Sequence, residues 1–219
     1  MKNKSILKLK ITLLDIKPTI WRRVLVEDTM VFDKLHAVIQ KVMGWDNCHM
    51  YDFSFGPELR ISNADEFEDN WGAEEDLPAA KTKLSKLIDE KGIKFLYNYD
   101  FGDGWRHQIL VEDILDLGKL KETSYPVCLD GKRACPPEDC GGSWGYMELI
   151  EALKDPEDDR HDEMSEWVSD DFDPEHFSVN DANLLLRPSK KKVTSSKKVK
   201  STSVSPKKKS VKKVKPPLD

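Results

Sequence analysis

The strongest constraint on the fold is a pair of alternating segments joined by the tripeptide Gly102-Asp103-Gly104. Apolar or aromatic side chains occupy every second position of residues 93–101, and residues 105–113 continue the alternation. An aspartate–glycine step between two such segments is typical of a β-hairpin, because glycine readily adopts the positive φ angles of tight turns. Side chains at alternate positions share a face of the sheet. The predicted inner face carries Ile93, Phe95, Tyr97, Tyr99 and Phe101 from the first strand and Trp105, His107, Ile109 and Val111 from the second.

The rest of the chain mixes short strands with helices. Alternation predicts strands over residues 7–13, 20–27, 49–55 and 58–62. Apolar spacing predicts a helix from Phe32 to Met43, capped by Thr29 and ended by Gly44. Further helices are predicted over residues 81–92, 145–155, 161–172 and 179–186, with a long loop over residues 122–145. This order predicts an α+β fold, a single domain with a largely antiparallel sheet of hairpins packed by several helices.

Charge divides the 219 residues into two parts. Residues 189–219 hold 12 lysines and one acid, whereas residues 1–188 hold 23 basic and 39 acidic residues. We expect residues 1–188 to form the α+β domain and residues 189–219 to be a disordered tail rich in lysine and serine, because such a composition cannot build a core. No apolar run approaches the roughly 20 residues needed to cross a membrane, and no secretory leader is recognised. The expected location is cytoplasmic, with no membrane partner.

The basic tail is a candidate for nucleic-acid contact. Lysines neutralise phosphates without reading sequence, and such contacts weaken as salt rises. The candidate residues are Lys190, Lys191, Lys192, Lys207, Lys208 and Lys209. The alternative interpretation is a solubilising tail that folds back on the acidic body.

Two histidines lie on predicted strands rich in aromatic side chains. One interpretation is that His49 and His107 are core residues, each hydrogen-bonded to a neighbour. The other is a shared pocket that includes Asp103. The lining of that pocket would be His49, Tyr51, Tyr99, Asp103, Trp105 and His107.

A loop with three cysteines suggests a zinc site. Cys128, Cys135 and Cys140 have spacings that approach those of structural zinc ligands, and His107 or His49 would supply a fourth. A site with four protein ligands would be closed and structural. The alternative is that the cysteines are small buried thiols in a loop stiffened by two prolines. Disulfides are not expected in a cytosolic protein.

Acidic residues in the same loop raise the question of catalysis. Glu138 and Asp139 could act with Asp103 as acid, base or metal ligands, although paired acids in a turn are usually solvated. The sequence contains no nucleophile elbow, phosphate-binding glycine loop or H-E-x-x-H helix. Residues 155–175 hold eleven acids against one arginine and are predicted to form a solvated helical face.

The motifs together resemble the plasmid pRiA open-reading-frame-three-like family, which also occurs as a passenger of insertion elements. The resemblance covers most of residues 5–187. It is carried by "IWRRVLV", "LHAVIQKVMGW", "HMYDF", "YDFGDGWRHQI", "CLDGKRACPPEDCGGSWGY" and "FDPEHF". It implies one α+β domain with no established activity. The usual His-Leu-His of the family is here His49-Met50-Tyr51, which weakens a metal site built on paired histidines, and the basic tail lies outside the resemblance.

Three functional interpretations follow, of which the first is favoured. It is a non-enzymatic binding or accessory module linked to mobile DNA, with a protein partner and a tail that contacts nucleic acid. The second is a metal-dependent hydrolase or nuclease that uses His49, Asp103, His107 and Glu138. The third is a protein-interaction domain stabilised by structural zinc.

Overall fold

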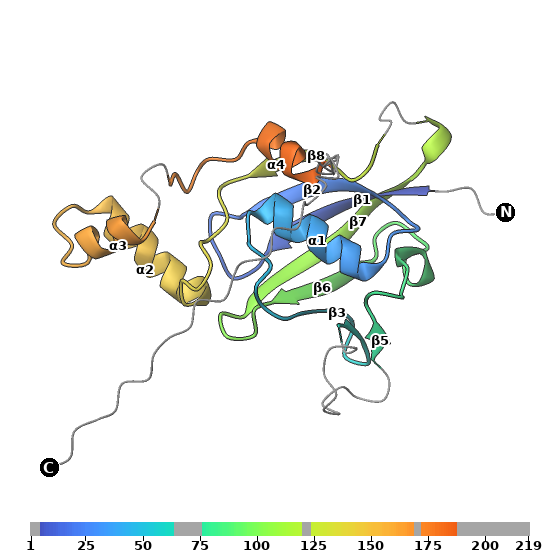
Figure 1. The fold of residues 1–219 in the computed structure, drawn as a ribbon, viewed down its shortest axis with the longest axis horizontal. Helices are drawn as coiled ribbons and strands as arrows, with labels where there is room; N and C mark the ends of the chain where they lie inside the picture. Colours follow the sequence, from blue (N-terminus) through green and yellow to red (C-terminus); the bar gives the residue numbers. More distant parts are fainter. Residues whose placement is uncertain (1–4, 64–75, 120–123, 169–171, 188–219) are drawn as a thin grey trace, which may run out of the picture. The chain divides into compact units, whose positions relative to one another are not determined.

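The computed structural model describes residues 5–63, 76–119, 124–168 and 172–187. It confirms the α+β class: eight strands form one sheet in the order β5-β4-β3-β6-β7-β1-β2-β8, and every pair except β4 with β5 is antiparallel (Figure 1). The strands are β1 Ser5–Leu13, β2 Trp21–Glu27, β3 Tyr51–Phe55, β4 Leu59–Ser62, β5 Leu77–Pro78, β6 Lys94–Tyr99, β7 Trp105–Asp116 and β8 Val127–Lys132. The helices are α1 Phe32–Met43, α2 Gly142–Lys154, α3 His161–Trp167 and α4 Val179–Leu186, with 3-10 turns at Leu84–Lys86 and Leu117–Lys119.

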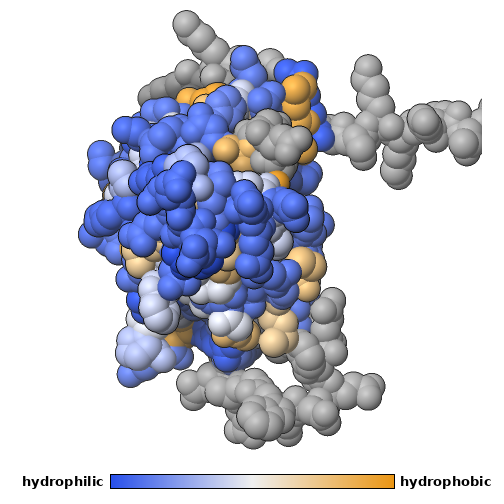
Figure 2. All heavy atoms as spheres, turned by 90° about the vertical axis from the view of Figure 1, so that its left-hand side faces the viewer, coloured by the Kyte–Doolittle hydropathy of each residue, from blue (hydrophilic) through white to orange (hydrophobic). Residues whose placement is uncertain are grey.

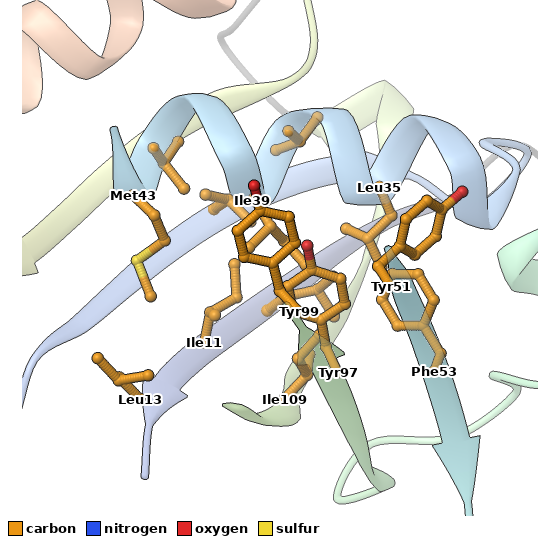
Figure 3. Close-up of a cluster of buried hydrophobic side chains, with 14 of the residues drawn as sticks. Ile11, Leu13, Leu35, Ile39, Met43, Tyr51, Phe53, Tyr97, Tyr99 and Ile109 are labelled. Atoms are coloured by element: carbon orange, nitrogen blue, oxygen red, sulfur yellow. The ribbon is translucent and has the colours of Figure 1, made fainter. Parts of the chain in front are cut away.

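The core lies between one face of the sheet and α1. Alternate residues of β1, from Leu7 to Leu13, are buried, whereas Lys8 and Lys10 on the other face are partly exposed. The apolar side of α1 covers the buried face, and Figure 3 shows side chains of this helix above those of β1, β3, β6 and β7. Burying these apolar side chains drives the two layers together. Across the described residues, no helix is long and apolar enough to span a membrane.

The hairpin forms as the sequence predicts, with one difference at its tip. β6 and β7 pair from Lys94 to Tyr99, and residues 100–104 make the turn. Asp100 has a φ of 53°, so the strand ends before it and the alternation does not continue to Phe101, which is 47% exposed. Phe101 therefore does not share the buried face of Tyr97 and Tyr99, contrary to the sequence prediction.

The prediction of a helix over residues 81–92 is wrong. Only a 3-10 turn at Leu84–Lys86 forms there. The backbone N–H groups of Leu84 and Ser85 donate to the carbonyls of Met30 and Asp28, at 2.8 Å each, instead of to carbonyls of their own segment. Tertiary hydrogen bonds to the connection between β2 and α1 thus override the helical pattern.

The long loop predicted over residues 122–145 contains an edge strand, β8, which pairs with β2. Its sequence, VCLDGK, does not alternate, so its pattern did not indicate a strand. The side chain of Asn183 on α4 donates to the carbonyl of Cys128 and accepts from its N–H, both at 2.8 Å. Asn183 therefore satisfies backbone groups of β8 as a neighbouring strand would.

The helix boundaries differ in detail from the prediction. α1 begins after Val31 without a side-chain cap, and the hydroxyl of Thr29 instead donates to Glu27, whereas Gly44 ends the helix with a φ of 97° as expected. α2 begins at Gly142 instead of residue 145, and α3 ends at Trp167 instead of residue 172. α4 matches the prediction. The tail lysines Lys190, Lys191, Lys192, Lys207, Lys208 and Lys209 lie outside the described residues.

Candidate metal centre

Three connections meet around His49. The first runs from the end of α1 at Gly44 to the start of β3 and contains His49 itself. The second is the turn between β6 and β7, which contributes Asp100. The third is the segment before α2, which contributes Glu138 and Asp139. Loops that a rigid sheet holds in place commonly carry binding residues.

His49 belongs to two groups of potential metal ligands. Its Nε2 atom lies 3.2 Å from an oxygen of Asp139 and 3.7 Å from an oxygen of Asp100. Cys48 and Glu138 form the second group with it. Within each group, the ligand atoms all lie within 4.8 Å of one another. Histidine, carboxylate and thiol ligands in this combination suit a borderline divalent ion such as Zn²⁺.

Two ligand atoms of the cluster are buried without a hydrogen-bond partner. They are Nε2 of His49 and Oε2 of Glu138. The carboxylates of Asp100 and Asp139 approach His49, but no contact has hydrogen-bond geometry. Buried polar atoms are nearly always paired, so each exception requires an explanation, such as a bound ion.

The backbone is in an uncommon conformation at three positions of the centre. Asn47, Asp100 and Asp139 have φ angles of 60°, 53° and 55°. Non-glycine residues with positive φ are uncommon, although asparagine and aspartate tolerate them best. Such conformations concentrate at functional sites, where the surrounding structure imposes them.

Hydrogen bonds fix Glu138 in the centre. Its Oε1 atom accepts from the N–H of Asp46 at 2.9 Å and from the hydroxyl of Tyr99 at 3.0 Å. The hydroxyl of Tyr99 accepts in turn from the N–H of Cys48 at 3.2 Å. Burial, followed by the contact with Glu138, raises the pKa of Tyr99, which therefore remains a neutral donor. This arrangement leaves Oε2 of Glu138 as the free ligand atom.

A buried network behind the centre holds Asn47. His36 donates from Nε2 to the side-chain oxygen of Asn47, and its Nδ1 accepts from the hydroxyl of Tyr97 at 2.8 Å. Gln40 donates to the same hydroxyl at 2.9 Å and accepts from the N–H of Asn47 at 3.1 Å. Burial lowers the pKa of His36 to about 4, so the ring is neutral at pH 7. The ring also stacks on Tyr51, with centroids 3.6 Å apart.

His107 is a core residue in the structure. Its side chain is fully buried, with ring centroids 5.4 Å from Trp45 and 5.3 Å from Tyr97. Nδ1 lies 3.4 Å from the carbonyl of Tyr97, and Nε2 has no partner. Burial lowers its pKa to about 3. Among the described residues, no group of three potential metal ligands includes His107.

The other predicted pocket residues have structural neighbours. A carboxylate oxygen of Asp103 accepts from the N–H of Gly141 at 3.2 Å and so holds the segment just before α2. Trp105 is buried beside Trp45, with ring centroids 5.9 Å apart. The hydroxyl of Tyr51 donates to Asp33 at 3.2 Å. Of the residues proposed for hydrolysis, the metal-ligand groups bring together only His49 and Glu138.

The loop cysteines do not assemble the predicted zinc site. Within the described ranges, no group of three potential ligands contains Cys128, Cys135 or Cys140. Cys128 lies on β8, whereas Cys140 precedes α2 and its thiol contacts the carbonyl of Gly142 at 3.9 Å. Burial raises the pKa of the Cys128 and Cys135 thiols. Burial also raises the pKa of Cys140, to about 12. All three cysteines are therefore protonated thiols. The cysteine that joins His49 is Cys48, which is not among the ligands predicted from the sequence.

Comparison with known proteins identifies relatives without an assigned activity. The family described as plasmid pRiA4b ORF-3-like protein matches residues 5–181. The "Uncharacterized protein y4hQ" of Sinorhizobium fredii is 40% identical over 171 residues, which are 77% of this chain and 84% of that protein. The crystal structure of the protein of unknown function MM3350 from Methanosarcina mazei Go1 has a TM-score of 0.71 and 36% identity, and the match covers 82% of this chain and 98% of that one.

Proposed function

The chain belongs to the plasmid pRiA4b ORF-3-like family. From that premise, we propose that it is a binding module that holds a divalent metal ion at His49. Zn²⁺ is the ion that the ligand types suit best. The observation that carries this proposal is the position of His49 Nε2. This atom is buried and has no hydrogen-bond partner, and His49 is the residue common to both groups of ligands. A bound cation would satisfy it and the free oxygen of Glu138 together.

The proposed site has an open side. The side chain of Asp139 is 72% exposed, so water or an external ligand can reach an ion held beside it. Structural zinc sites are closed by four protein ligands, whereas sites that act on other molecules keep a position free. This accessibility supports a site that binds an exchangeable ligand in preference to one that only stabilises the fold.

Removal of the imidazole tests the proposal. His49→Ala is expected to weaken Zn²⁺ binding about 100-fold or more, because both groups lose their common ligand. Isothermal titration of the purified chain with Zn²⁺, after removal of copurified metal by a chelator, measures the change. His176→Ala, which replaces an exposed histidine of another segment, is the matched control and is expected to bind Zn²⁺ as the unaltered chain does. Equal affinity in His49→Ala and the control would refute the site.

Metal-dependent hydrolysis is a second candidate, favoured by the same exposure of Asp139. A zinc ion lowers the pKa of a bound water to about 7 and so supplies a hydroxide at neutral pH. Asp103 and His107 are not part of this proposed hydrolytic site. Asp103 accepts a hydrogen bond from Gly141, and His107 is buried in the core. Cleavage of bis(p-nitrophenyl) phosphate by the zinc-loaded chain, abolished in His49→Ala, would support hydrolysis, and no cleavage by the loaded chain would contradict it.

We further propose that residues 189–219 contact nucleic acid, in keeping with an accessory role linked to mobile DNA. Their twelve lysines support this, whereas the acidic body opposes contact by the domain itself. Truncation after Pro188 is expected to abolish retention on immobilised duplex DNA at about 50 mM salt, a concentration at which phosphate contacts are strong. The double variant Ser195→Ala/Ser196→Ala keeps every lysine and is expected to be retained. Failure of the full chain to bind at low salt would contradict the proposal.

A further inference from the structure

We propose that the groove between α2 and α3 is a docking site for a short, lysine- or arginine-rich peptide segment of a partner protein that carries one apolar anchor residue. The groove has a volume of about 470 Å³. A space of this size accommodates one or two side chains of a bound peptide. The groove shares Asp139 with the proposed metal centre but is otherwise built from different residues.

The two helices present complementary faces to the groove. On α2, Glu148 and Leu149 lie one turn after Gly145 and so fall on one side of the helix. On α3, Met164 and Trp167 are three residues apart and share a side. Leu149, Met164 and Trp167 supply the apolar contacts of the groove, and Trp167 remains 46% exposed.

The border of the groove is acidic. Asp139, Glu148, Glu163 and Glu166 line it, and no lysine or arginine is among its described lining residues. The guanidinium of Arg160 lies 3.8 Å from Glu148 and 3.0 Å from Asp158. Figure 2 views the molecule from the side of α2 and α3 and shows a mainly hydrophilic surface with small hydrophobic areas. The excess of carboxylates over cations in this lining favours a positively charged partner and disfavours nucleic acid.

α2 also exposes two large apolar side chains outside the groove lining. Trp144 is 72% exposed and Met147 is 43% exposed, although both are large apolar side chains. Aromatic residues and methionine are enriched at protein interfaces, and tryptophan is prominent among the residues that carry binding energy. A cationic side chain can also lie against the face of Trp167. The chemistry of the partner segment is therefore cationic with an aliphatic anchor.

The test uses a defined peptide and the full chain. The probe is a fluorescein-labelled nine-residue peptide with four lysines around a central leucine, and fluorescence anisotropy reports binding. We expect saturable binding that Trp167→Ala weakens about tenfold, equal to about 1.4 kcal/mol. The double variant Glu163→Gln/Glu166→Gln is expected to weaken it by a similar factor. Asp89→Asn/Glu90→Gln, which removes two exposed acids outside the groove, is the matched control and is expected to leave affinity unchanged.

Other outcomes would overturn the proposal. Absence of saturable binding would do so, and so would equal affinity for a probe with serine in place of leucine, because the apolar contacts would then be unused. Equal weakening by the control variant would show attraction to the acidic body as a whole. Peptide binding is expected to survive His49→Ala, and Zn²⁺ binding to survive Glu163→Gln/Glu166→Gln. The docking site and the metal site can therefore fail separately.

Discussion

Acidification from pH 7 to pH 4.5 is expected to remove about 5 kcal/mol from the free energy of unfolding through His36 and His107 alone. Burial lowers their pKa values to about 4 and about 3, whereas an unfolded histidine has a pKa of about 6.5. Each pKa unit corresponds to 1.36 kcal/mol, so each histidine lowers the free energy of unfolding by about 2.6 kcal/mol at pH 4.5. Because small domains are stable by only about 5–15 kcal/mol, the loss is large.

The sign follows from which state binds the proton. Below pH 6.5 the unfolded chain takes up a proton at each histidine while the folded chain does not, so stability falls with falling pH. The stability that these neutral histidines contribute is fully present above pH 6.5. It is lost progressively as the pH falls towards the folded-state pKa values of about 4 and 3. Urea unfolding at pH 7, 5.5 and 4.5 measures this dependence.

The variants for this experiment are compared by the slope of the free energy of unfolding against pH and not by their stability at one pH. His107→Gln and His36→Gln are each expected to reduce the dependence of stability on pH by about half, even if either destabilises the protein at pH 7. His176→Gln, at an exposed position, is the control and is expected to keep the full slope. An unchanged slope in both core variants would show that these histidines do not limit acid stability.

The substitution Gly145→Ala is expected to destabilise the start of α2 by about 3 kcal/mol, at the upper end of the usual cost of overpacking. A Cβ atom at this position would clash with the carbonyl oxygen of Cys140, which belongs to the backbone and cannot rotate away. The segment before the helix must then shift, and this segment includes Glu138 and Asp139. We therefore expect Zn²⁺ affinity to fall together with stability.

A matched glycine separates this effect from the substitution itself. At Gly118 the added Cβ would meet only a side-chain oxygen of Asp116, at 3.5 Å, which is an ordinary contact. Gly118→Ala is expected to change stability by less than about 0.5 kcal/mol, as surface substitutions usually do. Thermal unfolding and Zn²⁺ titration of the two variants provide the comparison. Equal midpoints for both would contradict the close contact at Gly145.

The fold was predictable where periodicity and turn chemistry agree. The hairpin of β6 and β7 has both a clean alternation and a glycine-rich turn, and α1 has an apolar stripe ended by Gly44. β8 was missed because its pairing depends on β2 and on Asn183, neither of which its own sequence reveals. The apolar residues of segment 81–92 have helical spacing, but the backbone N–H groups of Leu84 and Ser85 donate hydrogen bonds to the connection between β2 and α1.

The candidate site was predicted only in part, for a related reason. His49, Glu138 and Asp139 were identified from residue type, but they were grouped with residues that the fold places elsewhere. Cys48 and Asp100 come close to His49 through irregular connections, one of which has a positive φ at Asp100. Such geometry depends on tertiary contacts, and sequence spacing does not record it.

The pairing of Asn183 with Cys128 bears on how the protein behaves when concentrated. An open edge strand can recruit a strand from a second molecule and begin aggregation. At β8 the amide of Asn183 already occupies the N–H and the carbonyl of Cys128, so an incoming strand would have to displace α4 before it could pair there. Through this single side chain, α4 blocks the addition of a strand at Cys128.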